Sequence, residues 1–297
     1  MIKRIKNIKQ NLKNIKPNFV EMKKDLQYIR LALGRIENRQ INKIYSTEFK
    51  VFSQWGEDGI IQYLLNNIKI DKKIFIEFGV ENYTESNTRF LLINNNWSGL
   101  VLDGNQENIN FIKHDEIYWK YNLKAEYAFI TAENINNIFE KNGISGEIGI
   151  LSIDIDGNDF WVWKAIKNVN PAIVICEYNY RFGEERAVTI PYRADFIRSK
   201  AHYSNLYGGA SIKALTLLAK NKGYSLVAGN ENGNNVFFVR NDLLNDVITE
   251  KDISDIYRVG QFRESRNKKG ELTFLSFEEE LKLIKDLKLI DVEDMFK

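Results

Sequence analysis

Apolar residues near the start of the chain recur at alternating spacings of three and four positions. Such spacing places the apolar side chains along one stripe of a helix. Pro17 has no amide hydrogen to donate, so we expect a short helix up to Ile15 and a longer helix from about Phe19 to Glu37. The residues of the stripe are Ile5, Ile8, Leu12, Ile15, Phe19, Met22, Leu26, Ile29, Leu33 and Ile36.

After residue 45, short apolar runs alternate with segments of helical spacing. Near-continuous apolar runs are typical of parallel strands covered on both faces. A turn rich in Gly and Asn separates the last two runs and suits an antiparallel hairpin. The pattern predicts an α/β fold with a doubly wound, mostly parallel, seven-stranded Rossmann-like sheet. The expected strands are residues 73–80, 98–104, 126–131, 148–156, 171–179, 224–229 and 235–240, and the expected helices are 59–66, 87–94, 105–114, 134–141, 160–166 and 212–222.

The chain thus divides into an N-terminal helical arm, an α/β domain and a C-terminal tail, with expected bounds of 1–44, 45–240 and 241–297. The tail has a helical pattern in parts, most clearly over residues 277–287. A chain of 297 residues is long enough for one large domain with such appendages.

Charge separates the arm from the rest of the chain. The arm carries 12 Lys/Arg and 3 Asp/Glu, a net charge of +9. Because the whole chain has a formal net charge of +2, residues 45–297 carry a net charge of −7. The mildly acidic body argues against a general nucleic-acid binder. The second helix predicts a coiled coil that joins chains into a homo-oligomer. The lysines before Pro17 suit peripheral contact with an anionic membrane, and a third reading is a helix that packs on its own body.

The few cysteines and histidines narrow the chemistry. Cys176 is the only cysteine and lies in an apolar run, so no intrachain disulfide can form and a reducing compartment is expected. His114 and His202 are too few for a histidine-rich zinc site. The sequence contains no run of about eighteen apolar residues, so it gives no indication of a membrane-spanning helix. We therefore expect a cytoplasmic protein, with the inner face of the membrane as an option for the arm.

Polar residues stand at the end of each of the first five expected strands. Ligands of doubly wound sheets bind beyond the carboxyl ends of the strands. A glycine after the first strand allows a ligand to approach the backbone. An acidic residue at the end of the second strand can accept hydrogen bonds from both hydroxyls of a ribose. Capping of the following helices explains some of these acids singly but not the whole set. The strand-end residues are Glu77, Gly79, Asp103, Thr131, Asp154, Asp156, Glu177 and Asn179.

Four ordered blocks resemble those of FkbM-type S-adenosylmethionine (SAM)-dependent methyltransferases: SQWGEDGIIQYLL from Ser53, FIEFGVENYTESNTRFLL from Phe75, NWSGLVLDGN from Asn96 and LSIDIDGND from Leu151. The resemblance spans roughly residues 51–240 and implies the class I methyltransferase fold. It also implies methyl transfer to sugar hydroxyls of natural products or surface polysaccharides.

The same resemblance implies roles for single residues. Glu77 and Gly79 would lie by the amino-acid part of the cofactor, Asp103 would bind the ribose, and residues near Thr131 would border the adenine. Tyr83 departs from the family pattern, because many members have a second glycine about four residues after the first. The loop under the methionine moiety must therefore differ in shape. Further residues assigned to cofactor binding are Gln54, Asn87 and Asp154.

The aspartates after the fourth strand suggest how a hydroxyl would be activated. A sugar hydroxyl is a weak acid, and either a base or a divalent cation can assist loss of its proton. Carboxylate and amide oxygens suit Mg²⁺ better than zinc. The arrangement resembles that of magnesium-dependent catechol O-methyltransferases. We predict a magnesium site of Asp154, Glu177 and Asn179, with Asp156 as a further ligand or base, while helix caps and contacts to acceptor hydroxyls are the metal-free alternatives.

A connection of about thirty residues follows the fifth strand, and loops this long are usually lids or binding loops. His202 within it is a candidate base. Aromatic and basic residues of the same connection are candidates for sugar and anion binding: Tyr178, Tyr180, Arg181, Arg186, Tyr192, Arg193, Tyr203 and Tyr207.

Two other classes of function compete with methyl transfer. Asp154-x-Asp156 after an apolar strand is how many glycosyltransferases hold a manganese-bound sugar nucleotide. That reading explains neither Glu77-x-Gly79 nor the position of Asp103. A coiled-coil scaffold that carries a degenerate, non-catalytic methyltransferase domain is the third reading.

Overall fold

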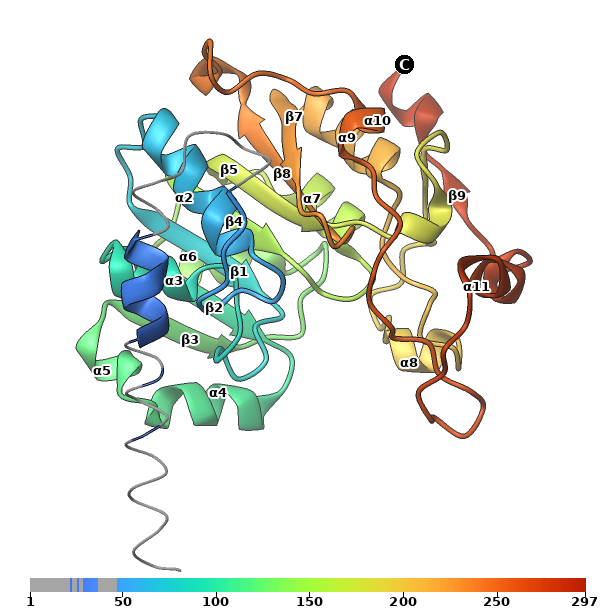
Figure 1. The fold of residues 1–297 in the computed structure, drawn as a ribbon, viewed down its shortest axis with the longest axis horizontal. Helices are drawn as coiled ribbons and strands as arrows, with labels where there is room; N and C mark the ends of the chain where they lie inside the picture. The colour runs from blue at the N-terminus through green and yellow to red at the C-terminus, as the bar shows by residue number, and fades with distance from the viewer. Residues whose placement is uncertain (1–21, 23–25, 27–28, 37–46) are drawn as a thin grey trace, which may run out of the picture.

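The computed structural model describes residues 22, 26, 29–36 and 47–297, and its centre is a seven-stranded sheet (Figure 1). The strand order is β3-β2-β1-β4-β5-β8-β7. The strands of this sheet are β1 (Ile74–Phe78), β2 (Ser98–Asp103), β3 (Leu123–Tyr127), β4 (Gly146–Ile153), β5 (Val169–Glu177), β7 (Tyr224–Gly229) and β8 (Asn235–Arg240).

Strand directions complete the topology. β1 runs parallel to β2 and β4, with Phe75 opposite Gly99 and Ile150. β8 runs antiparallel to both of its neighbours, β5 and β7. A parallel sheet with one reversed strand in this position is the class I methyltransferase fold, as the sequence predicts.

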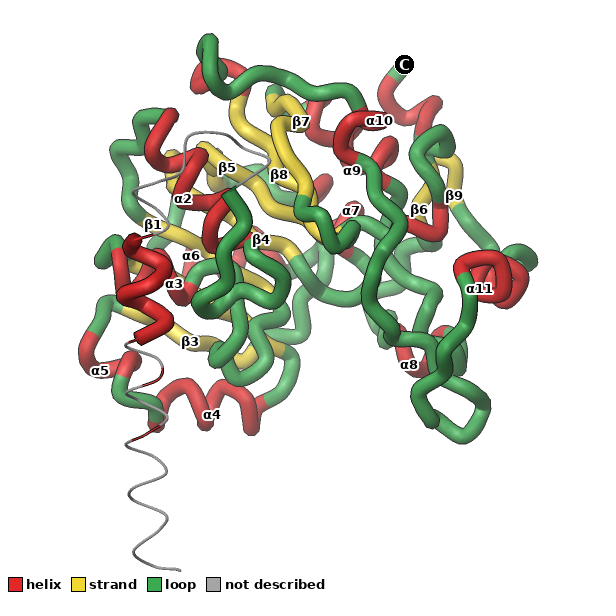
Figure 2. Tube along the Cα trace, viewed as in Figure 1, coloured by secondary structure: helices red, strands yellow, loops and turns green. Residues whose placement is uncertain are grey.

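Helices cover both faces of the sheet because successive strand residues point to opposite sides (Figure 2). Ile76 packs with α6, α7 and α9, whereas Phe75 packs with α2, α3 and α4 on the other face. The α-helices of the domain are α2 (Glu57–Asn67), α3 (Arg89–Asn94), α4 (Gln106–His114), α5 (Ile117–Lys120), α6 (Ile135–Lys141), α7 (Asp159–Ala165), α8 (Arg198–Ala201) and α9 (Ile212–Asn221).

The third strand lies earlier in the chain than predicted. The apolar run at 126–131 suggests the strand, but the observed strand β3 is Leu123–Tyr127. β3 is an edge strand, and Lys124 and Tyr127 on it are exposed while Leu123 and Ala125 are buried. An edge strand of this kind alternates between apolar and polar residues, so a search for continuous apolar runs misses it.

The C-terminal tail contains little regular structure. Its elements are short: η3 (Asn241–Leu243), α10 (Ile253–Ile256), α11 (Phe277–Ile284), β9 (Ile290–Asp291) and η4 (Glu293–Phe296), and β9 pairs with β6 (Val188–Thr189). The predicted helix at 277–287 is confirmed over Phe277–Ile284, where α11 lies. Residues 257–266, which we call the strap, pass without helix or strand from α10 across the domain toward α8 (Figure 1).

The described part of the arm is helical at residues 22, 26 and 29–36. Leu31 packs on Val51, Phe52 and Phe90 of the body. The predicted helix before Pro17 lies outside the described residues. Within the described part of the chain, no helix has the length and apolar character needed to cross a membrane. Five residues of the predicted stripe are more than half exposed: Met22, Leu26, Ile29, Leu33 and Ile36.

Candidate active site

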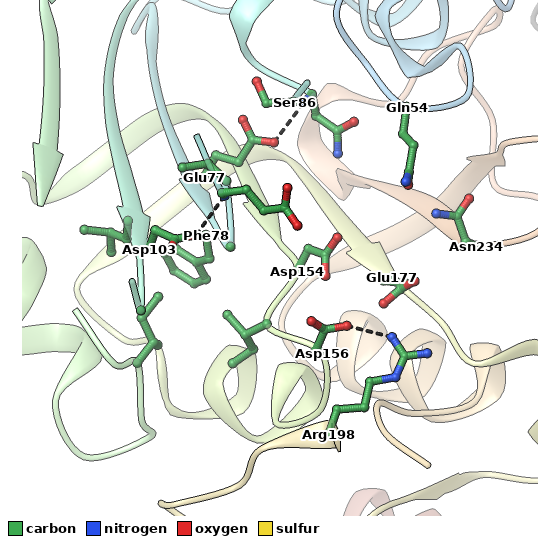
Figure 3. Close-up of a pocket in the computed structure, with 18 of the residues that line it drawn as sticks. Gln54, Glu77, Phe78, Ser86, Asp103, Asp154, Asp156, Glu177, Arg198 and Asn234 are labelled. Atoms are coloured by element: carbon green, nitrogen blue, oxygen red, sulfur yellow. Dashed lines mark hydrogen bonds and ion pairs between the residues drawn. The ribbon is translucent and has the colours of Figure 1, made fainter. Parts of the chain in front are cut away.

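A cavity of about 610 Å³ opens at the carboxyl ends of β1, β2, β4 and β5 (Figure 3). Cavities of roughly 300–1,000 Å³ hold most small-molecule ligands and cofactors. Asp103 lies on one side of it and Gln54 and Asn234 on the other, with Asp154 between them. Eight of the residues selected from the sequence line this cavity: Gln54, Glu77, Gly79, Asn87, Asp103, Asp154, Asp156 and Glu177.

Gly79 permits the close approach of two strand ends. Its φ of +65° lies in the left-handed region, which glycine adopts without steric cost. A Cβ atom there would lie 1.8 Å from the carbonyl oxygen of Asp154. No other residue fits, so the end of β1 and the start of the acidic cluster are held against each other by this glycine.

Glu77 shapes the loop beside the cavity. Its carboxylate accepts hydrogen bonds from the amides of Asn87 (2.8 Å) and Thr88 (3.0 Å) and from the Thr88 hydroxyl (2.5 Å). Burial raises the pKa of Glu77 to about 7, although these hydrogen bonds act in the opposite direction. Glu77 therefore fixes the end of the segment 80–88, where a second glycine is missing and where Glu81 and Tyr83 have positive φ.

Asp103 ends β2 with both carboxylate oxygens in use. One oxygen accepts from the amide of Glu81 (2.7 Å), and the other accepts from Asn105 (2.8 Å) and from the Asn108 side chain (3.0 Å). The oxygen bound to Glu81 keeps a free lone pair, because a carboxylate offers about four acceptor positions. Asp103 can therefore still accept a hydrogen bond from a hydroxyl group of a ligand in the cavity.

Asp58 places Gln54 at the opposite wall. One oxygen of this buried carboxylate accepts from the amides of Val51 (2.8 Å), Phe52 (2.7 Å) and Ser53 (2.9 Å). Burial raises the pKa of Asp58 to about 6. The three hydrogen bonds fold residues 51–53 around the start of α2, so that Gln54 follows at the cavity (Figure 3).

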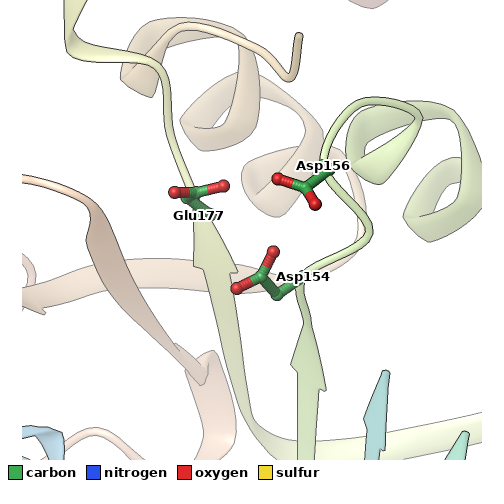
Figure 4. A group of neighbouring side chains, drawn as sticks. All are labelled: Asp154, Asp156 and Glu177. Atoms are coloured by element: carbon green, nitrogen blue, oxygen red, sulfur yellow. The ribbon is translucent and has the colours of Figure 1, made fainter. Parts of the chain in front are cut away.

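Three carboxylates converge beyond β4 and β5 (Figure 4). Asp154, Asp156 and Glu177 each offer an oxygen within 4.8 Å of the others. Burial, followed by the charges of Glu177 and Asp156, raises the pKa of Asp154 well above its usual value. Burial also raises the pKa of Glu177, to about 8. Such a group of acids favours a bound cation, which would restore the charged forms.

Arg198 of α8 supplies part of the opposing charge. Its guanidinium donates to Asp156 (2.6 Å) and to Glu264 of the strap. Burial alone would lower the pKa of Arg198, but the charges of Glu264, Glu177 and Asp156 raise it. One arginine faces three cluster carboxylates, so the cluster can accept more positive charge.

Asp159 forms the turn after β4. Its two oxygens accept from the amides of Ile155 (2.9 Å) and Gly157 (2.8 Å). These bonds hold Asp156 in the left-handed conformation, with φ 59°. The cluster geometry therefore depends on an aspartate that does not itself line the cavity.

The structure does not bring three predicted site residues to the cavity. Asn179 donates to the carbonyl oxygens of Leu206 (3.0 Å) and Gly208 (2.9 Å), and its oxygen accepts from the Arg181 amide. Its amide is thus occupied by these partners, and the carboxylates that converge are Asp154, Glu177 and Asp156, the further ligand of the prediction. Thr131 lies beyond the shifted end of β3 and accepts from the amide of Asn134, the N-cap of α6.

His202 is likewise separate from the residues that line the cavity. Its ring nitrogen contacts Ser204 (2.7 Å), and burial lowers its pKa. The loop tyrosines also differ from expectation, because Tyr178 and Tyr180 are buried and Tyr192 bonds to Glu133 and to the Ala132 amide. These side chains stabilise the long connection and present no free ring to the cavity.

Sequence reasoning did not select several residues of the cavity wall, and four of them matter most for its shape. Trp55 precedes α2, and Asn234 lies in the turn directly before β8, the second strand of the final hairpin. Arg198 lies in the long connection and Phe262 in the strap. Trp55 and Asn234 stand within or beside segments already selected, whereas nothing in the local sequence marks Phe262.

No family model matches the chain, and no curated protein matches it. Among solved structures, the N-terminal domain of EvdMO1 with S-adenosylhomocysteine (SAH) bound is similar at 13% identity and TM-score 0.41, covering 70% of this chain and 95% of that chain. A putative O-methyltransferase from Klebsiella pneumoniae is 11% identical with TM-score 0.40, covering 71% and 90%. M. capricolum TrmK in complex with SAH is 14% identical with TM-score 0.36, covering 65% and 73%. Likenesses this weak establish no activity for the present chain.

Proposed function

We propose that the chain is a SAM-dependent O-methyltransferase of the FkbM type that acts on a sugar hydroxyl of a glycan or glycosylated metabolite. The observation that carries this proposal is a single cavity that joins the Gly79 and Asp103 strand ends to the acidic cluster. A class I methyltransferase fold places these features where a cofactor and an acceptor would meet.

The residues at β1 and β2 fit the cofactor. Gly79 lies against the Asp154 carbonyl and carries no side chain, so a ligand can approach the backbone at the end of β1. Asp103 retains acceptor capacity for a ribose hydroxyl, and Phe129 and Ile130 supply an apolar border for an adenine. Bound there, SAM would supply the electrophilic methyl group.

Asp154, Asp156 and Glu177 fit Mg²⁺ by their chemistry, since three carboxylates can offer oxygen ligands at one point. Each of these carboxylates directs an oxygen toward the others, so the oxygens are placed to bind a cation between them. Bound there, Mg²⁺ would lower the pKa of an acceptor hydroxyl. Without it, the deprotonated form of either carboxylate would orient the hydroxyl and accept its proton.

Thermal-shift titration tests this proposal. We expect SAH to raise the melting temperature, by several degrees at saturating concentration, and Mg²⁺ to act through the cluster. Asp154→Asn should abolish the response to Mg²⁺, whereas Asp71→Asn, an exposed site outside the cavity, should retain it. Stabilisation by UDP-sugars with Mn²⁺, and none by SAH, would instead identify the glycosyltransferase alternative. Full methyl transfer in excess chelator would remove the metal from the mechanism.

We also propose that the arm joins two or more copies of the chain. The described helix buries Leu31 and Gly34 against the body while the stripe of Met22, Leu26 and Ile29 faces solvent. Alternating three-four spacing on a face directed away from the body is the pattern of a coiled coil. A membrane-bound helix is the alternative for the same stripe.

A further inference from the structure

The strap is fastened to the sheet by close backbone contacts. Tyr178 donates from its hydroxyl to the carbonyl of Arg258 (2.9 Å) and accepts from the Arg258 amide (3.0 Å). A Cβ atom on Gly260 would lie 2.2 Å from the ring of Tyr180. The strap therefore lies against the end of β5 with no space for a side chain at this point.

Buried ion pairs fasten the strap on its other side. The side chain of Arg181 is 1% exposed and donates to Glu264 of the strap (2.8 Å) and to Glu280 of α11 (2.9 Å). Glu264 also pairs with Arg198, which reaches Asp156 of the acidic cluster. The two attachments hold residues 260–264 at a fixed position beside the cluster.

Phe262 is presented to the cavity between these attachments. Its ring stacks on Trp55 with centroids 6.1 Å apart and planes 30° apart, and Tyr180 supports it edge-on at 5.8 Å. Trp55 and Phe262 both line the cavity, and Trp55 remains 38% exposed. Two segments from opposite ends of the sequence thus form one aromatic wall.

Glu57 fixes the other half of this wall. The carboxylate is 0% exposed and accepts from the Trp55 amide (2.9 Å) and from the side chains of Asn230 and Asn235 (2.8 Å each). The turn between β7 and β8 also bonds to the strap through the amide of Gln261 (3.0 Å to the Asn232 carbonyl). The position of Trp55 relative to the strap is therefore set by the same turn.

We propose that Trp55 and Phe262 form the wall that binds the ring of the acceptor, and that the strap thereby determines acceptor specificity. This inference rests on the proposed methyl transfer. The aromatic faces carry negative charge density that attracts the polarised C–H groups of a saturated ring. Carboxylates across the cavity can accept hydrogen bonds from hydroxyl groups, and side-chain amides can also donate hydrogen bonds to them. The site therefore fits a polyhydroxylated ring.

Saturation-transfer NMR on the SAH-loaded protein tests the wall. The probes are the methyl pyranosides of glucose, mannose, galactose and rhamnose, each at millimolar concentration. We expect saturation of ring C–H protons for at least one probe, and a loss of at least five-fold in Phe262→Ala and Trp55→Ala. Phe262→Tyr should retain binding. Phe274→Ala is the matched control, because Phe274 follows the strap, is 71% exposed and does not line the cavity.

SAH affinity separates the two levels of the proposal. All four variants should bind SAH as the wild type does, because neither ring lies at the cofactor strands β1 and β2. Equal saturation in wild type and both alanine variants, or no saturation for any probe, would contradict the proposed role of the aromatic wall. SAH binding in the same samples would still support the methyltransferase proposal. Glycoside binding that depends on both rings without SAH binding would retain the wall and reject methyl transfer.

Discussion

At the scale of single residues, Glu177 and Asp154 are acids held where charge is unfavourable. Burial and neighbouring carboxylates raise the pKa of both groups, that of Glu177 to about 8, so Glu177 tends to keep a proton near neutral pH. A cation beside them reverses that preference. The same property that makes the cluster suited to a positively charged ligand therefore makes the empty protein sensitive to pH.

Glu177→Gln should show this sensitivity in thermal unfolding. The pKa of Glu177 is raised from 4.5 to about 8. Between these values the unfolded chain has released the proton while the folded protein retains it, so stability falls as pH rises through this range. The glutamine variant lacks the titration. Its melting temperature relative to wild type should increase from about pH 5 to pH 8, by about 2–4 °C for each kcal/mol of difference in the free energy of unfolding.

The control for this measurement is Asp71→Asn, whose side chain is 77% exposed. Its unfolding curve should follow the wild type at each pH. Parallel dependence of Glu177→Gln and wild type on pH would show that Glu177 is ionised in the folded protein across the range.

Residues at strand ends could be predicted because a parallel sheet brings its carboxyl ends to one edge. Glu77, Asp103 and Asp154 were found in this way and line the cavity. The direction of a side chain and the presence of a nearby acceptor are not encoded locally. For that reason the sequence could not indicate that the side chains of Asn179 and His202 bond to backbone and hydroxyl partners in the long connection and do not line the cavity.

At the scale of elements, regular periodicity was reliable where an element is buried and misleading at an edge. The final hairpin matches its predicted bounds, 224–229 and 235–240. The exposed edge strand β3 does not. The strap shows neither the helical nor the strand spacing of apolar residues. Its position depends on contacts with Tyr178 and Arg181, which lie about 80 residues earlier. Such long-range contacts explain why the tail could not be assigned from its own sequence.

Arg181 should be the most sensitive point of this attachment. Replacing it in Arg181→Met leaves Glu280 without its cationic partner in a site where its side chain is 6% exposed. Removing one partner of a buried ion pair costs roughly 3–5 kcal/mol. Urea unfolding should show a loss of that size. Arg193→Met is the matched control, since its pair with Asp195 is exposed and contributes about 0–1 kcal/mol. Equal stability of the two variants would contradict a buried anchor.

At the scale of the whole molecule, the arm and the body have separable roles. The cavity is lined by residues between 54 and 264. The described residues of the arm contact the outside of the domain, where Leu31 packs on it and Arg35 donates to the Asn94 side chain (2.7 Å). The exposed aliphatic side chains of the stripe suit the proposed association with a second stripe of the same kind.

Light scattering on the full chain should give at least twice the monomer mass of 34.7 kDa. The double substitution Leu26→Lys and Leu33→Lys places charges on the stripe and should yield monomers, because a coiled coil buries these positions. Ala32→Lys is exposed beside the stripe and should leave the mass unchanged. SAH binding should persist in every variant, since the cavity lies elsewhere. A monomeric wild type that sediments with vesicles of phosphatidylglycerol and phosphatidylcholine would instead assign the stripe to a membrane surface.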